Sequence, residues 1–142
     1  MTLALGKDEL QAFLMEVFPE VMDQYQVDDV TETTVRMRLK VRSRDLRPGG
    51  TVSGPAMFSL ADVAVYAMVL ARIGREALTV TTNASIDFMR KPEAGRDLIA
   101  ECRLLKLGRV LAVCDVLIHS EGSDGVVARS SMTYSIPPVK VG

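Results

Sequence analysis

The longest apolar segment of the chain, residues 56–71, constrains the fold more than any other feature. Pro55 stands just before it and favours a helix start, because the first turn of a helix does not need the N–H that proline lacks. Gly74 follows the segment, and glycine is typical of helix C-termini. A helix that is apolar nearly all round is buried rather than laid on a surface. The rest of the chain therefore has to wrap around a helix spanning about residues 55–73.

This segment contains a single charged residue, Asp62. A buried carboxylate costs several kcal/mol unless it is paired or used. At about 100° per residue, Ser59, Asp62 and Tyr66 fall within a wedge roughly 60° wide. Asp62 could act there as a nucleophile or as a general base, which predicts an active site. A purely structural role, with Asp62 paired to a buried arginine or a backbone group and the two hydroxyls bonded locally, stays open.

The start of the same helix offers a second chemical group. Backbone N–H groups at a helix N-terminus carry positive potential and suit a developing oxyanion. Because Pro55 has no N–H, the donor has to be Gly54 or Ala56. A carbonyl held at Gly54 would lie within a turn or two of the carboxylate. Ser53 can donate a hydrogen bond or cap the helix.

The other segments mostly show strand periodicity. Residues 33–42 alternate between apolar and basic side chains, and residues 110–118 are nearly continuously apolar, as expected of a central strand. Helical spacing over residues 7–18 predicts an N-terminal amphipathic helix that ends at Pro19. The predicted strands cover residues 24–30, 33–42, 78–89, 97–107, 110–119 and 125–136. Gly108-Arg109 is a good hairpin turn between two of them.

We therefore predict an α+β fold in which an antiparallel sheet wraps around a long central helix. The 142 residues, 48% of them apolar, suit one domain, with an N-terminal helix in residues 1–20 and a core in residues 21–137. A net charge of −1 without long charge runs argues against a general nucleic-acid or membrane-surface binder.

Two cysteines, Cys102 and Cys114, and one histidine, His119, do not form a zinc motif, so we expect no metal and no cofactor. Charged residues at positions 7–9 occupy the place where a signal peptide needs apolar ones, and the apolar segment falls short of a bilayer span. These features predict a cytoplasmic protein whose cysteines are reduced, buried thiols.

The sequence from the loop into the helix also resembles a known family. Gly50-Thr51-Val52-Ser53-Gly54-Pro55, followed by Ser59-Leu60-Ala61-Asp62, is similar to the motif of the hotdog-fold acyl-CoA thioesterases. It resembles in particular the phenylacetate-degradation (PaaI-like) type and the hydroxybenzoyl-CoA type that shares its helix motif. The resemblance covers about residues 25–136 and continues downstream at Thr81, Phe88, Arg90 and Pro92.

The chain departs from the family pattern at three positions. Ser53 replaces a histidine, Pro55 replaces the second glycine, and Arg47 stands where an asparagine or glutamine often orients the carboxylate or water. The acid and the position of the oxyanion donor are retained. The departures leave open a non-catalytic acyl-CoA or lipid-binding protein of the same fold. A hotdog dehydratase or hydratase would require His119 to face Asp62.

The resemblance implies hydrolysis of an acyl-CoA thioester to a free acid and CoA. Gly54 N–H would polarise the thioester carbonyl, and Asp62 would attack it or activate water. The protein would be a dimer or a dimer of dimers with shared sites, in which Asp62 comes from one subunit and the strand from Thr81 to Phe88 approaches from its partner. Candidate substrate-binding residues are Ser53, Pro55, Ser59, Tyr66, Thr81 and Asn83, with Arg90, Lys91 and Arg109 as cations for the CoA phosphates, although each cation alone could be a plain surface charge.

Overall fold

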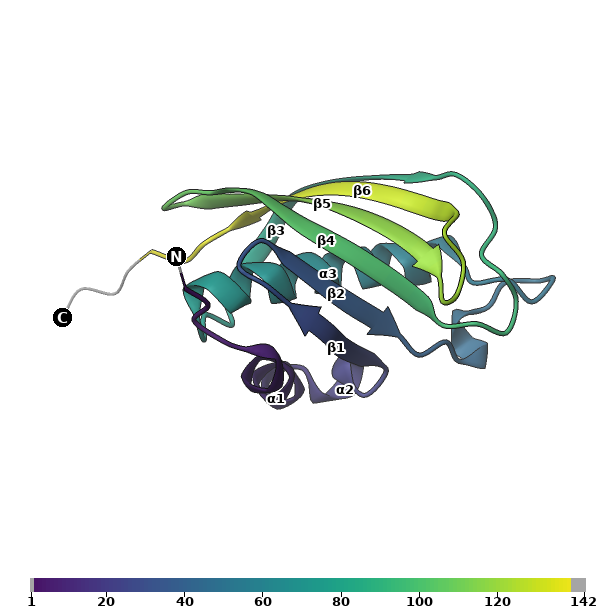
Figure 1. Cartoon of the computed structure of the whole chain (residues 1–142), viewed down its shortest axis with the longest axis horizontal. Coiled ribbons are helices and arrows are strands. Elements are labelled where there is room, and N and C mark those ends of the chain that lie inside the picture. The colour runs from purple at the N-terminus through teal and green to yellow at the C-terminus, as the bar shows by residue number, and fades with distance from the viewer. Residues whose placement is uncertain (1, 139–142) are drawn as a thin grey trace.

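A computed structural model describes residues 2–138 of the chain. One six-stranded antiparallel sheet curves around the long helix α3 (Gly54–Ile73), which confirms the predicted α+β architecture (Figure 1). The strands are β1 (Tyr25–Val30), β2 (Thr34–Leu39), β3 (Val80–Phe88), β4 (Leu98–Leu107), β5 (Leu111–Ser120) and β6 (Val126–Ser135). Their order across the sheet is β1-β2-β4-β5-β6-β3.

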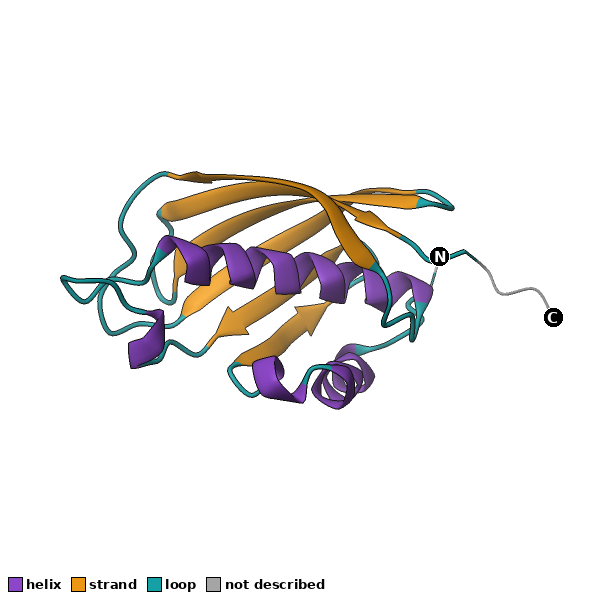
Figure 2. Ribbon diagram, turned by 180° about the vertical axis from the view of Figure 1, so that it is seen from behind, coloured by secondary structure: helices purple, strands orange, loops and turns teal. Residues whose placement is uncertain are grey.

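Helix α3 begins and ends as the sequence predicts. The Ser53 side chain caps its N-terminus by accepting a hydrogen bond from Ala56 N–H, and Gly74 at its C-terminus has a φ of 96°. Figure 2 shows the helix lying along the inner face of the curved sheet. At 20 residues it is long and apolar enough to span a bilayer, so the expectation that this segment falls short of a span was wrong. Its burial against the sheet makes it the core helix of the domain.

Strand β5 differs from its prediction. It lies between β4 and β6, as expected of a central strand, but its side chains alternate between buried and exposed. Leu111 and Leu117 point away from the core and are each nearly half exposed. The continuous apolar run therefore does not correspond to burial on both faces, because in the single chain only the inner face is covered by a helix.

The N-terminal region holds one helix more than predicted. Helix α1 (Lys7–Val17) is followed at once by α2 (Pro19–Met22), so Pro19 both stops one helix and starts the next. The loop predicted before α3 contains a single 3-10 turn, η1 (Ser43–Asp45), and the main-chain N–H of Ser53 donates to Asp45 O at 2.8 Å. These contacts fix the entry into α3.

Strand β3 lies at the edge of the sheet and pairs only with β6. Nearly all of its side chains are exposed, and its register shifts between Thr81 and Asn83. An exposed edge strand presents unpaired backbone groups to a second chain. This edge bears directly on the candidate site, because β3 also contacts α3.

The two cysteines are buried free thiols, as predicted. They lie on the neighbouring strands β4 and β5, and the Cys114 neighbour together with burial raises the pKa of the Cys102 thiol well above its usual value.

Candidate active site

The carboxylate of Asp62 is held by two hydroxyl groups from two strands. Thr81 of β3 donates a hydrogen bond to Oδ1 at 2.7 Å, and Tyr134 of β6 donates to the same oxygen at 2.5 Å. Asp62 is partly buried, and no cation pairs with it among the described residues. Oδ2 accepts no hydrogen bond from any side chain or backbone group between residues 2 and 138. One oxygen is therefore fixed and the other is available for chemistry.

Sequence reasoning missed Tyr134. Its side chain is only 3% exposed, and its hydroxyl also lies 2.9 Å from the main-chain oxygen of Asp62. Burial, followed by the charge and hydrogen bond of Asp62, raises the pKa of Tyr134 far above its ordinary value, so the hydroxyl stays a donor. The sequence did contain a signal for this contact, because Tyr134 lies on the inward-facing side of the last strand. A buried tyrosine hydroxyl normally has a hydrogen-bond partner.

The start of α3 leaves one N–H free. Of the two predicted oxyanion donors, Ala56 N–H is used by the Ser53 side chain at 3.3 Å. Met57 N–H donates to Ser53 O, and Pro55 has no N–H. Within the described part of the chain, Gly54 N–H has no acceptor, so it is the donor that remains available to a ligand.

Gly54 and Asp62 of one chain are not brought together. Eight residues of α-helix separate them by about 12 Å along the axis. A reacting carbonyl carbon has to lie about 3–3.5 Å from the attacking atom. A carbonyl hydrogen-bonded to Gly54 is therefore out of direct reach of the Asp62 carboxylate of the same chain.

Both ends of β3 contact α3 of the same chain. Thr81, near the start of the strand, bonds Asp62, while the Phe88 ring packs against Gly54, where an added Cβ would lie 3.2 Å from Phe88 Cζ. The chain's own Thr81 therefore bonds Asp62, and the approach of the same strand from a partner subunit stays a prediction. Helix α3 lies on the inside of the same sheet that β3 borders, so the chain's own edge strand is near enough to make these contacts.

The other members of the predicted wedge have different partners. Ser59 lies 2.7 Å from the hydroxyl of Tyr25, a β1 residue that sequence reasoning did not identify. The Tyr66 hydroxyl donates to Ala77 O at 2.8 Å, and its ring packs near the rings of Phe18 and Tyr134. Burial raises the pKa of both Tyr25 and Tyr66. Ser59, Asp62 and Tyr66 therefore form hydrogen bonds with different groups and not with one another.

The predicted phosphate-binding cations lie at opposite ends of the sheet. Arg90 and Lys91 follow the end of β3, where the Arg90 guanidinium lies over Gly125. Arg109 lies in the β4–β5 turn, next to the strand ends that pair with the start of β3. Asn83 is exposed on β3, opposite Thr133 of β6. One chain does not gather these cations at a single point.

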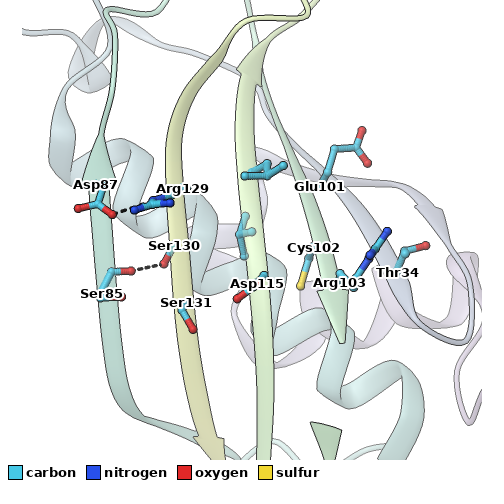
Figure 3. A pocket seen from close by; sticks show the side chains of 12 residues that line it. Thr34, Ser85, Asp87, Glu101, Cys102, Arg103, Asp115, Arg129, Ser130 and Ser131 are labelled. Atoms are coloured by element: carbon cyan, nitrogen blue, oxygen red, sulfur yellow. Dashed lines mark hydrogen bonds and ion pairs between the residues drawn. The ribbon is translucent and has the colours of Figure 1, made fainter. Parts of the chain in front are cut away.

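His119 does not face Asp62. It lies 3.7 Å from Glu101 and 3.1 Å from the oxygen of Ser120, so nothing here supports the dehydratase alternative. Across residues 2–138, no three His, Cys, Asp or Glu side chains gather into a group that could hold a metal ion. A hollow of about 680 Å³ lies on the outer face of the sheet, as Figure 3 shows, and no predicted site residue lines it.

Comparisons with known proteins identify the family of the chain. Residues 49–127, more than half of the chain, match the family described as the thioesterase superfamily. A protein from Silicibacter sp. TM1040, described provisionally as a thioesterase, is 63% identical, with a TM-score of 0.91 over 97% of this chain and 96% of that one. A comparison with curated proteins found no match.

Two more distant structures share the fold. A single-site mutant of the phenylacetic acid degradation protein PaaI from Thermus thermophilus is 24% identical, with a TM-score of 0.71 over 84% of this chain and 99% of that one. A hypothetical thioesterase from Streptococcus pneumoniae, solved with coenzyme A, is 19% identical, with a TM-score of 0.75 over 90% and 99%.

The chain belongs to the thioesterase superfamily and has the hotdog fold. Its chemical class is that of a thioester hydrolase.

Proposed function

We propose that this protein hydrolyses acyl-CoA thioesters to a free acid and CoA in the cytoplasm. The observation that carries the proposal is the Asp62 carboxylate, held through one oxygen by Thr81 and Tyr134 and left free at the other. The coenzyme A bound to the Streptococcus pneumoniae neighbour supports CoA as the leaving group.

The free Gly54 N–H would stabilise the oxyanion that forms on the thioester carbonyl. Asp62 would either attack the carbonyl carbon or take a proton from the attacking water. In both cases the C–S bond breaks, the CoA thiolate leaves and is protonated, and one water molecule is consumed per acid released. Neither route needs a metal or a redox cofactor.

A complete site would need two chains, because one chain separates Gly54 from Asp62 by about 12 Å along α3. The exposed edge of β3 offers the required pairing surface. If two β3 strands pair antiparallel about a two-fold axis between Ala84 and Ser85, Thr81 lies beside Phe88 of the partner subunit. Asp62 then lies next to Gly54 of the partner subunit, since each of these residues contacts its own end of β3.

This pairing would also bring together the candidate phosphate-binding cations, which lie at opposite ends of the sheet in one chain. Antiparallel pairing would place Arg109 of one subunit at the end of the sheet edge that carries Arg90 and Lys91 of the partner subunit, where the phosphates of one CoA could meet all three. Ser53, Pro55 and Asn83 would line the same seam. The assembly is then a dimer, or a dimer of such dimers.

An acyl-CoA panel with thiol detection tests the activity. We expect the wild type to release CoA and Asp62→Asn to lose at least about a hundredfold in kcat/KM, the scale of lost acid–base catalysis. Asp115→Asn, the same change at an exposed carboxylate of β5, is the matched control and should keep wild-type activity. Thermal stabilisation by acyl-CoA without release of thiol would instead identify a binding protein.

The oxyanion donor has its own pair of variants. Gly54→Pro removes the free N–H at a position where proline fits, because Ser53 before it is extended, with a ψ of 158°. Gly54→Ala keeps the N–H and requires only a small shift of the Phe88 ring. We expect Gly54→Pro to lose about 10²–10³ in kcat, and Gly54→Ala to lose much less. Equal losses in the two variants would contradict this role.

A further inference from the structure

Tyr134 directs its hydroxyl at the functional group of the candidate site, whereas the other two tyrosines bond groups outside it. Tyr66 donates to the main-chain oxygen of Ala77, and Tyr25 bonds the Ser59 hydroxyl. The Tyr134 hydroxyl contacts two oxygens of Asp62, the main-chain oxygen at 2.9 Å and carboxylate Oδ1 at the shorter distance of 2.5 Å. The main-chain oxygen alone would satisfy a buried hydroxyl, so the shorter contact to the carboxylate is not required by burial.

The hydrogen bonds on Asp62 are unevenly distributed between its two oxygens. Oδ1 accepts from Tyr134 at 2.5 Å and from Thr81 at 2.7 Å. The two donors come from β6 and β3, which pair directly, with Thr81 opposite Tyr134 in the register. Because both strands are fixed in the sheet, the two hydroxyls hold the carboxylate in one rotamer and prevent its oxygens from exchanging places.

We propose that Tyr134 is a positioning residue for the hydrolysis, which holds Oδ1 of Asp62 so that Oδ2 is the oxygen presented to the thioester or to water. This inference rests on the proposed function and assigns to the last strand a part in a site otherwise built from α3 and β3. Tyr134 itself touches neither the substrate nor the reacting atoms in this arrangement. Its effect on the reaction passes through the carboxylate.

The three tyrosines near the carboxylate are neutral. The Asp62 charge influences the titration of Tyr25 of β1 and of Tyr134 of β6, and the ring of Tyr66 packs against Tyr134. Burial raises the pKa of all three tyrosines, so each hydroxyl keeps its proton under assay conditions. Replacing Tyr134 or Tyr25 by phenylalanine therefore removes a hydroxyl and leaves the net charge unchanged.

The test compares Tyr134→Phe with Tyr25→Phe, which removes a hydroxyl from an equally buried ring that lies beside the same helix. We expect Tyr134→Phe to lower kcat by about tenfold or more with KM changed less than about threefold, since hydrogen bonds to charged groups contribute more than neutral ones. Tyr25→Phe removes no bond to Asp62 and should leave kcat within about threefold of the wild-type value.

Thr81 supplies a second variant pair should Tyr134→Phe fold poorly. Thr81→Val removes the other Oδ1 donor and should also lower kcat, whereas Thr81→Ser keeps a hydroxyl and should restore it. A Tyr134→Phe enzyme with unchanged kcat overturns the inference, even where Asp62→Asn is inactive. Full activity in Asp62→Asn would instead contradict the proposed function. Failure of the Tyr134 inference and failure of the proposed function therefore give different results.

Discussion

Mixing two inactive variants should restore activity if the site is shared between chains. The perturbations are Asp62→Asn, which removes the carboxylate, and Gly54→Pro, which removes the oxyanion donor. In a mixed dimer, one site receives both defects. The other site combines Asp62 of the Gly54→Pro chain with Gly54 of the Asp62→Asn chain, and is intact.

The size of the recovery follows from the geometry. With random pairing of equal amounts, half of the dimers are mixed and each has one intact site of two, so about a quarter of the wild-type activity should return. Within one chain the two groups lie about 12 Å apart along α3, so a site made inside one chain would not be restored by mixing.

The assay denatures an equimolar mixture of the two variants, refolds it, and measures thiol release from the acyl-CoA that the wild type hydrolyses best. Each variant refolded alone is the baseline, and different affinity tags on the two variants allow the mixed species to be counted. Activity that stays at the baseline while mixed dimers are present would refute the shared site. Activity recovered without any mixed species would refute the β3 pairing.

Three further predictions concern the fold around the site. Ser53→Ala removes the hydrogen bond that caps α3 and should cost about 1 kcal/mol of unfolding free energy in a denaturant titration, whereas Ser53→Asp should retain most of it. Gly74→Ala places a side chain at a φ of 96° and should lower Tm, an expectation that an unchanged Tm would contradict. Cys102 and Cys114 should not react with a thiol reagent at pH 8 until the protein is denatured, because both are buried and the pKa of Cys102 is raised. Rapid labelling of the folded protein would contradict this expectation and show that the sheet opens at these residues.

The α+β architecture could be predicted from local patterns. The sequence shows an apolar helix bounded by Pro55 and Gly74, together with strands of two-residue periodicity. These elements specify a sheet wrapped around a helix, because few other arrangements would bury that helix. The helix cap at Ser53 and the buried cysteines were also predictable, since both depend on residues close in sequence or on periodicity alone.

Other features depended on contacts between distant segments. The spacing of apolar residues did not reveal α2, because α2 begins at Pro19, directly after the end of α1. The apolar run of β5 did not show that the outer face of this strand is exposed. The sequence placed Ser59, Asp62 and Tyr66 on one side of α3 as a single group. In the structure, Ser59 bonds Tyr25 and Tyr66 bonds Ala77, so these two side chains do not bond Asp62.

By itself the sequence determined which carboxylate lies in the apolar helix and that Pro55 leaves Gly54 and Ala56 as the N–H groups beside it at the helix start, because these follow from the residues of one helix. Only the tertiary structure decided that Ala56 N–H is taken, that Tyr134 holds Asp62, and that one chain keeps Gly54 away from the acid. The physical reason is that hydrogen-bond partners 72 residues apart are set by sheet register, which no local pattern encodes.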